Sequence, residues 1–162
     1  MNNNSFDSSK IDYTNLIAVD LNNGRLNFVA QDIHGTSLSG DTISVPLNKK
    51  DYFYLLAFFD YGCNGCEAVW SESSSRFGEI NNGELIVILK DLPQLQKSED
   101  LSAGSVTVVC SSQAWNDFKI SNKSYVVVIH NRLVVTESSV LNFDHLLALE
   151  ARATTKISQR QL

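Results

Sequence analysis

Two cysteines separated by two residues form the pair in this sequence that is best suited to chemistry. Cys63 and Cys66 enclose Asn64 and Gly65, and they follow closely on an apolar run over residues 52–59. In a C-x-x-C pair one thiolate can attack a substrate sulfur, and the second thiol can then resolve the mixed disulfide. Such a pair next to a strand-helix pattern is the sequence signature of a redox motif.

The spacing after Cys63 predicts a helix that buries one face. Residues at intervals of three and four share a helix face, and here they are Cys66, Val69, Ser73, Phe77 and Ile80. Cys63 would stand at the helix start, where unpaired backbone N–H groups and the helix dipole favour a thiolate. Cys66 would lie one turn deeper, on the buried face. We therefore predict that Cys63 attacks and that Cys66 resolves.

Other uses of the two cysteines stay open at this point. They could form a structural disulfide, or they could supply two ligands of a zinc site. Zinc would need further ligands, and the candidates His34, His130 and His145 lack ligand spacing to the pair. We interpret each histidine as a turn or surface residue, and we expect no metal and no cofactor.

Acidic residues near the pair have two interpretations. Asp60 could transfer protons to the thiols, although a role in capping the turn is favoured. Asp60 and Glu67 would both raise the thiol pKa, against the effect of the helix dipole.

Composition limits the function classes. The 162 residues suit a single domain with a real core, since 43% are hydrophobic. A formal charge of −5 with no basic run argues against nucleic acid as a partner. No stretch approaches the ~18 apolar residues of a membrane span, and the first residues lack the apolar core of a signal peptide. We expect a cytoplasmic monomer, with export or membrane association possible if the start of the chain is misassigned.

The order of elements predicts an α/β fold with a mixed sheet. We expect an edge strand over 26–31, a turn at His34-Gly35, a second short strand over 41–47 and the buried strand 52–59. A stop follows the cysteine helix at 81–83, with Gly83 able to take a positive φ, and buried strands follow over 84–89 and 105–110. We expect residues 93–101 to form a short helix or a surface excursion. Alternation of strands with helices indicates parallel central strands.

The last third of the chain adds a hairpin and a helix. Ser111 or Ser112 can cap a short helix that carries Trp115 and Phe118. A hairpin over 125–135 turns at residues 130–132, and Asn142 can cap a final helix. We expect a loosely packed segment over 1–15, a domain over 16–153 and a polar tail over 154–162.

This order, with C-x-x-C after the central strand, resembles the thioredoxin-like superfamily, and within it the TlpA/MauD-like and AhpC/TSA-related branch. Three stretches carry the resemblance: FVAQDIHGTSL over 28–38, LLAFFDYGCNGCEAVW over 55–70, and the segment 108–135 with its S-x-x-A-W helix. The resemblance implies a three-layer α/β/α sandwich with a mixed central sheet and an N-terminal β extension.

The resemblance also implies roles for individual residues. Cys63 matches the nucleophilic cysteine of the family and Cys66 its resolving cysteine. Ser124 stands where the family usually has a cis-proline, and Ala57 stands in place of a buried acidic residue. The residues implied to contact substrate are Gly62, Asn64, Gly65, Ser124 and Tyr125.

Three functions follow from these observations. The first is a thiol–disulfide oxidoreductase that acts on protein thiols or disulfides with an unidentified electron donor. The second is a thiol-dependent peroxide reductase, in which Cys63 becomes a sulfenic acid that Cys66 resolves. The third is a non-catalytic binding module, which the missing proline at Ser124 favours.

Overall fold

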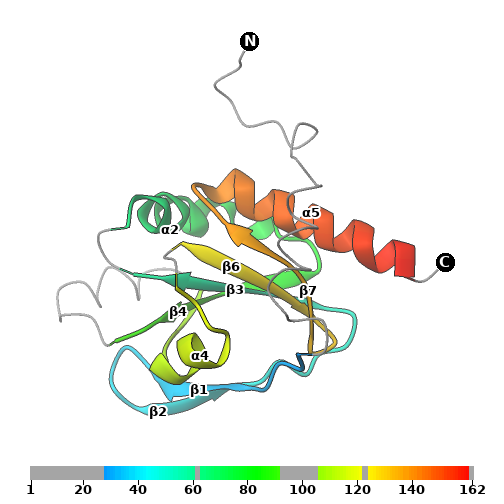
Figure 1. Cartoon of the computed structure of the whole chain (residues 1–162). Helices are drawn as coiled ribbons and strands as arrows, with labels where there is room; N and C mark the ends of the chain where they lie inside the picture. The colour runs from blue at the N-terminus through cyan, green and yellow to red at the C-terminus, as the bar shows by residue number, and fades with distance from the viewer. Residues whose placement is uncertain (1–27, 61–62, 92–105, 122–123, 161–162) are drawn as a thin grey trace.

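The computed structural model describes residues 28–60, 63–91, 106–121 and 124–160. These residues form a seven-stranded mixed sheet with the order β2-β1-β5-β4-β3-β6-β7 (Figure 1). Strands β3 (Phe53–Phe59), β4 (Gly83–Leu89) and β5 (Thr107–Cys110) are parallel. The strands at both edges are antiparallel: β1 (Ile33–Thr36), β2 (Thr42–Val45), β6 (Tyr125–His130) and β7 (Leu133–Ser139).

Strand β3 lies at the centre because all seven of its side chains are apolar and all are buried. Its odd-numbered side chains, such as Leu55 and Phe59, enter the core beneath helices α2 (Asn64–Arg76) and α5 (Phe143–Arg160). Its even-numbered ones, such as Leu56 and Phe58, enter the core beneath helix α4 (Ser112–Asp117). A strand that is apolar on both faces is typical of a parallel sheet covered on both sides. The predicted three-layer arrangement with a mixed sheet is therefore confirmed.

Helices cover both faces of this sheet. Helices α2 (Asn64–Arg76) and α5 (Phe143–Arg160) lie on one face, and α4 (Ser112–Asp117) lies on the other, beside β1 and β2 (Figure 1). Cys66, Val69 and Ser73 are buried on α2 as the spacing predicts. The α-helix itself stops at Arg76, and η2 (Phe77–Glu79) is a single 3-10 turn that leads to the buried Ile80.

Several local predictions were wrong. His34 and Gly35 belong to strand β1 and form no turn, because pairing with β2 across four residues overrides their turn preference. Gly83 begins β4 opposite Phe53, and among the described glycines only Gly40 has a positive φ. A side chain at Gly83 would collide with the Phe53 carbonyl, which explains why this position is glycine.

The hairpin was predicted correctly except for its turn. His130 is the last residue of β6, is buried and packs its ring 4.9 Å from that of Phe53, so it is neither a turn nor a surface residue. The turn consists of Asn131 and Arg132, which both have positive φ, as hairpins with two-residue turns of type I′ require.

Residues 154–160 of the polar segment are helical and do not form a frayed tail. Helix α5 continues to Arg160, because Leu149, Ala153 and Ile157 extend its apolar face at intervals of four. Asn142 caps this helix as predicted, since its Oδ1 accepts the His145 N–H at 2.9 Å. None of the helices in the described part of the chain has the length and apolar character needed to cross a membrane. The predictions for 1–15, 26–27 and 93–101 lie outside the described residues.

Candidate active site

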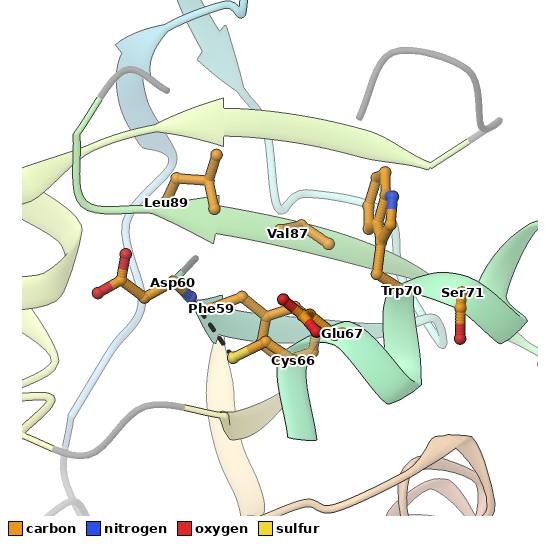
Figure 2. Close-up of a pocket in the computed structure, with 8 residues that line it drawn as sticks. All are labelled: Phe59, Asp60, Cys66, Glu67, Trp70, Ser71, Val87 and Leu89. Atoms are coloured by element: carbon orange, nitrogen blue, oxygen red, sulfur yellow. Dashed lines mark hydrogen bonds between the residues drawn. The ribbon is translucent and has the colours of Figure 1, made fainter. Parts of the chain in front are cut away.

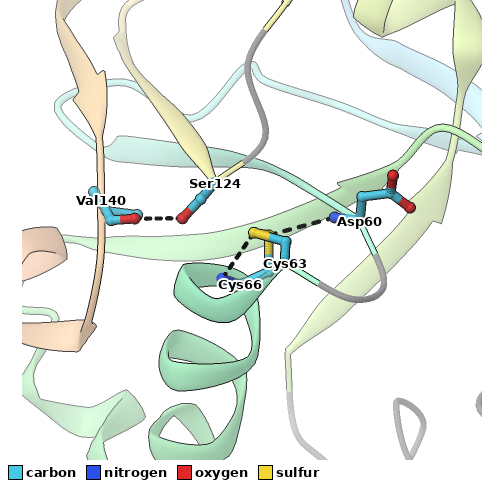
Figure 3. Close-up of a disulfide and its surroundings, with 5 residues drawn as sticks. All are labelled: Asp60, Cys63, Cys66, Ser124 and Val140. Atoms are coloured by element: carbon cyan, nitrogen blue, oxygen red, sulfur yellow. Dashed lines mark hydrogen bonds between the residues drawn. A yellow bond between two sulfur atoms is a disulfide. The ribbon is translucent and has the colours of Figure 1, made fainter.

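The two cysteines are joined as a disulfide at the first turn of α2 (Figure 3). Their Cα atoms lie 5.2 Å apart, within the usual range for such a bond. Cys63 is the N-cap of the helix, because its carbonyl accepts the Glu67 N–H at 3.0 Å. Cys63 is partly exposed, whereas only 4% of Cys66 is. The outer sulfur is therefore accessible and the inner one is shielded.

Backbone N–H groups point at both sulfurs. The Cys66 N–H donates to Sγ of Cys63 at 3.1 Å, as the N–H of the third helical residue does to an ordinary cap side chain. The Asp60 N–H donates to Sγ of Cys66 at 3.4 Å. Such donors stabilise negative charge on sulfur once the disulfide is reduced.

The carboxylate of Asp60 takes no part in these contacts. It is exposed and directed away from both sulfurs (Figure 3), so it is the backbone of this residue that reaches the disulfide. The resemblance matches Ala57 to a buried acidic residue, and the structure has a fully buried methyl group at this position of β3. None of these contacts brings a carboxylate within hydrogen-bonding distance of sulfur.

Ser124 closes the site on the side of the sheet. Its φ is +61°, in the left-handed region, and it is 6% exposed. Its hydroxyl donates to the Val140 carbonyl, and its own carbonyl accepts the Val140 N–H at 2.8 Å (Figure 3). This double contact joins the start of β6 to the segment that leads into α5.

Gly65 fits against this junction because it has no side chain. A Cβ at Gly65 would lie 2.5 Å from Oγ of Ser124 and 2.7 Å from the Val140 carbonyl oxygen. The helix start thus contacts the Ser124 side chain and the Val140 carbonyl at a position where any larger residue would separate them. The neighbouring Leu141 is 66% exposed, and its N–H donates to Nδ1 of His145 at 3.0 Å.

His145 holds this segment as a neutral ring. Burial lowers the pKa of His145, and the charge of Asp144 opposes this only in part. The neutral form keeps Nδ1 as an acceptor for Leu141. No group of three or more possible metal ligands occurs in the described ranges.

The predicted site residues divide into three groups. Cys63, Cys66, Gly65 and Ser124 come together at one end of the sheet. Tyr125 does not join them, because its ring packs on the α4 side and its hydroxyl donates to Oε1 of Glu137 at 2.8 Å. Gly62 lies outside the described residues. Asn64 is the first residue of α2.

Sequence reasoning missed two parts of this region. One is the Val140 segment, which reaches Gly65 only through long-range packing. The other is a pocket beside Cys66, bounded by Trp70 on the helix and by side chains of β4. Neither has a local sequence pattern that could reveal it.

Comparison with known proteins shows the fold. No model of a protein family matches the sequence, and no curated protein matches it either. The thioredoxin domain of a thiol-disulfide oxidoreductase from Bacteroides vulgatus is 19% identical, with a TM-score of 0.55 over 76% of this chain and 94% of that one. StoA from Bacillus subtilis is 14% identical, with a TM-score of 0.58 over 76% and 98%. A peroxiredoxin-like protein from Aquifex aeolicus is 16% identical, with a TM-score of 0.56 over 77% and 85%. The chain therefore has a thioredoxin-like fold, as its sequence predicts.

Proposed function

We propose that this protein is a thiol–disulfide oxidoreductase that exchanges electrons with cysteines of other proteins through Cys63 and Cys66. The observation that carries the proposal is a disulfide at a helix N-terminus with one accessible and one shielded sulfur. An accessible sulfur can meet a partner, and a shielded one reacts only within the protein. The similarity to a domain of a thiol-disulfide oxidoreductase agrees with this function.

The reaction begins from the reduced pair. The Cys63 thiolate attacks one sulfur of a substrate disulfide, forms a mixed disulfide and expels the other substrate sulfur as a thiolate. The Cys66 thiolate then attacks Sγ of Cys63, which releases the second substrate thiolate and leaves Cys63 and Cys66 joined. Two electrons pass to the substrate, and water protonates the released thiolates. A dithiol donor would restore the reduced pair, and the reverse sequence would oxidise a substrate dithiol.

Roles for the neighbouring groups follow from their contacts. The Cys66 N–H stabilises the attacking thiolate, because it points at Sγ of Cys63 from 3.1 Å. Gly65 and Ser124 form the wall beside the reacting sulfurs, and Asn64 is a flanking contact for the substrate. In this proposal the domain, which includes α5 as far as Arg160, acts as a monomer and without nucleic acid.

Trapping of the mixed disulfide tests the proposal. The Cys66→Ser variant, incubated with oxidised insulin, should accumulate a conjugate that dithiothreitol releases, because the resolving step is removed. The matched Cys63→Ser variant should form none. Mass mapping of the conjugate identifies the sulfur that attacks. Equal rates of insulin reduction by wild type and Cys63→Ser would instead support a binding module, and consumption of hydrogen peroxide without insulin reduction would support a peroxidase.

A further inference from the structure

An apolar pocket of about 250 Å³ lies between the first turns of α2 and the ends of β3 and β4 (Figure 2). Its floor consists of buried side chains, and its rim consists of exposed ones. The floor residues are Phe59, Cys66, Val87 and Leu89, with the partly buried Trp70 at one end. The rim residues are Asp60, Glu67 and Ser71. Because three neighbouring rim residues are exposed, the pocket opens to solvent.

The pocket adjoins the reactive disulfide directly. Cys66 forms part of its wall, and the sulfur of Cys66 is bonded to that of Cys63. A group that enters the pocket therefore lies against the residue whose sulfur is bonded to Cys63. A side chain adjacent to a partner's cysteine can span such a short distance.

The charge at the rim has one sign. The lining residues that the structure describes include the carboxylates of Asp60 and Glu67 but no lysine or arginine. Water and salt screen exposed carboxylates, so they contribute little affinity but favour a cationic neighbour over an anionic one. The apolar floor and acidic rim together define the chemistry of the occupant.

We propose that this pocket receives a large apolar side chain next to the reacting cysteine of a substrate protein, and that Asp60 and Glu67 favour a lysine or arginine beside it. The proposal rests on the function proposed above and names the substrate class for that site. The volume supports this occupant. Sites for drug-sized ligands and cofactors hold ~300–1,000 Å³, and this pocket, at about 250 Å³, lies below that range. A single leucine or phenylalanine side chain suits the smaller space and the apolar floor.

Disulfide peptides test the proposal. Each synthetic peptide has an internal disulfide and one variable residue, phenylalanine or serine, placed before or after the reacting cysteine. The dithiothreitol-reduced protein should reduce the better phenylalanine peptide about tenfold faster, in kcat/KM, than its serine counterpart, as expected for burial of one aromatic side chain. Exchange of a neighbouring arginine for glutamate should lower the rate about two- to threefold, and high salt should remove that difference.

A matched pair of variants locates the effect in the pocket. Ser71 and Ser75 are both exposed on α2, and each hydroxyl donates to the carbonyl three residues earlier at 3.1 Å. Only Ser71 is among the described lining residues. In the Ser71→Trp variant the ratio of kcat/KM between the phenylalanine and serine peptides should therefore fall from about ten to about one. In Ser75→Trp the ratio should stay at about ten. The Glu67→Gln variant should narrow the preference for arginine over glutamate and leave that for phenylalanine unchanged.

The outcomes separate this proposal from the proposed function. Hydroxyethyl disulfide, which has no apolar side chain, serves as the reference substrate for wild type. Reduction of this reference and of all peptides at equal rates would overturn the pocket proposal and leave the oxidoreductase function intact. Loss of the phenylalanine preference in Ser75→Trp as well would also overturn it. Failure of wild type to reduce any disulfide would overturn the function itself.

Discussion

Two junctions between a strand and a helix lie at the same end of the sheet, where the parallel strands finish. Only one of them has the arrangement of a redox site. In the first, β3 leads to Cys63 and α2. In the second, β5 leads to Ser111 and α4. Because β3 and β5 both run parallel to β4, the two helices begin at the same end of the sheet, although they cover opposite faces.

The two helix starts share their hydrogen-bond pattern. Sγ of Cys63 accepts the Cys66 N–H at 3.1 Å, and Oγ of Ser111 accepts the Ala114 N–H at 3.1 Å. The Cys63 carbonyl accepts the N–H of Glu67, four residues later. The Ser111 carbonyl accepts the N–H of Trp115 in the same way. The backbone geometry of a helix N-terminus is thus present twice in this chain.

The difference lies in the cap atom and in its exposure. The hydroxyl of Ser111 is buried and also donates to the His34 carbonyl at 2.6 Å, so it fastens β1 to the helix. The sulfur of Cys63 is partly exposed and bonded to a second sulfur. Cys110, next to Ser111, is a free buried cysteine whose pKa burial raises. A helix start therefore offers chemistry only where the cap is a sulfur that solvent can reach.

Removal of one cysteine at each junction, Cys63 or Cys110, provides the largest contrast between the junctions. The Cys63→Ala variant should reduce insulin no faster than dithiothreitol alone, because no sulfur remains to start the exchange. The Cys110→Ala variant should keep the wild-type rate, because the Cys110 thiol is buried and cannot meet a substrate. Turnover at equal protein concentration measures both. A large loss of turnover in a folded Cys110→Ala variant would contradict this distinction.

Substitution two residues after the cap should affect the free energy of unfolding at the first junction more than at the second. A Cβ at Gly65 would press on Oγ of Ser124 and on the Val140 carbonyl, so Gly65→Ala should cost about 2 kcal/mol of unfolding free energy. Gln113 occupies the matching position in α4 and is exposed, so Gln113→Ala should change it by less than about 0.5 kcal/mol. Urea unfolding of the oxidised proteins provides the comparison. A neutral Gly65→Ala would mean that the two segments are not in close contact.

Loss of the oxygen cap should destabilise the second junction by a similar or smaller amount. The Ser111→Ala variant loses the bond to the Ala114 N–H and leaves the His34 carbonyl without this donor. Together these effects should cost about 2 kcal/mol. The neighbouring Ser112 is exposed and serves as the control, with little change expected for Ser112→Ala. Equal effects of the two variants, again in urea, would show that the cap is not what stabilises α4.

The sequence predicts most of what is local in this comparison. The continuous apolar run identifies β3, the C-x-x-C spacing identifies the helix start, and Ser111 is recognisable as a cap before Trp115. Each of these depends on residues within a few positions of one another. For the same reason the apolar spacing of α5 beyond residue 153 was available in the sequence, although its polar composition suggested a tail.

The remainder depends on contacts between distant segments. His34 joins a strand only because β2 pairs with it, and the Val140 carbonyl meets Gly65 across 75 residues of chain. The pocket beside Cys66 needs both α2 and β4 to form its walls. Long-range packing of this kind overrides local preference, and a single sequence carries no pattern that indicates it.

The smallest expected effect concerns the alkaline stability of the second junction. Burial raises the pKa of Cys110, and repulsion by Asp91 adds to the shift, so the folded state prefers the neutral thiol. The resulting stabilisation is fully present below the unfolded pKa of about 8.5 and is lost as the pH rises through the folded value. Between about pH 7 and about pH 10, oxidised wild type should therefore lose more unfolding free energy in urea than Cys110→Ala, by less than ~1 kcal/mol. The Cys63–Cys66 disulfide does not titrate, and the other groups are common to both proteins, so equal losses would mean that the Cys110 thiol ionises as easily in the folded state as in the unfolded one.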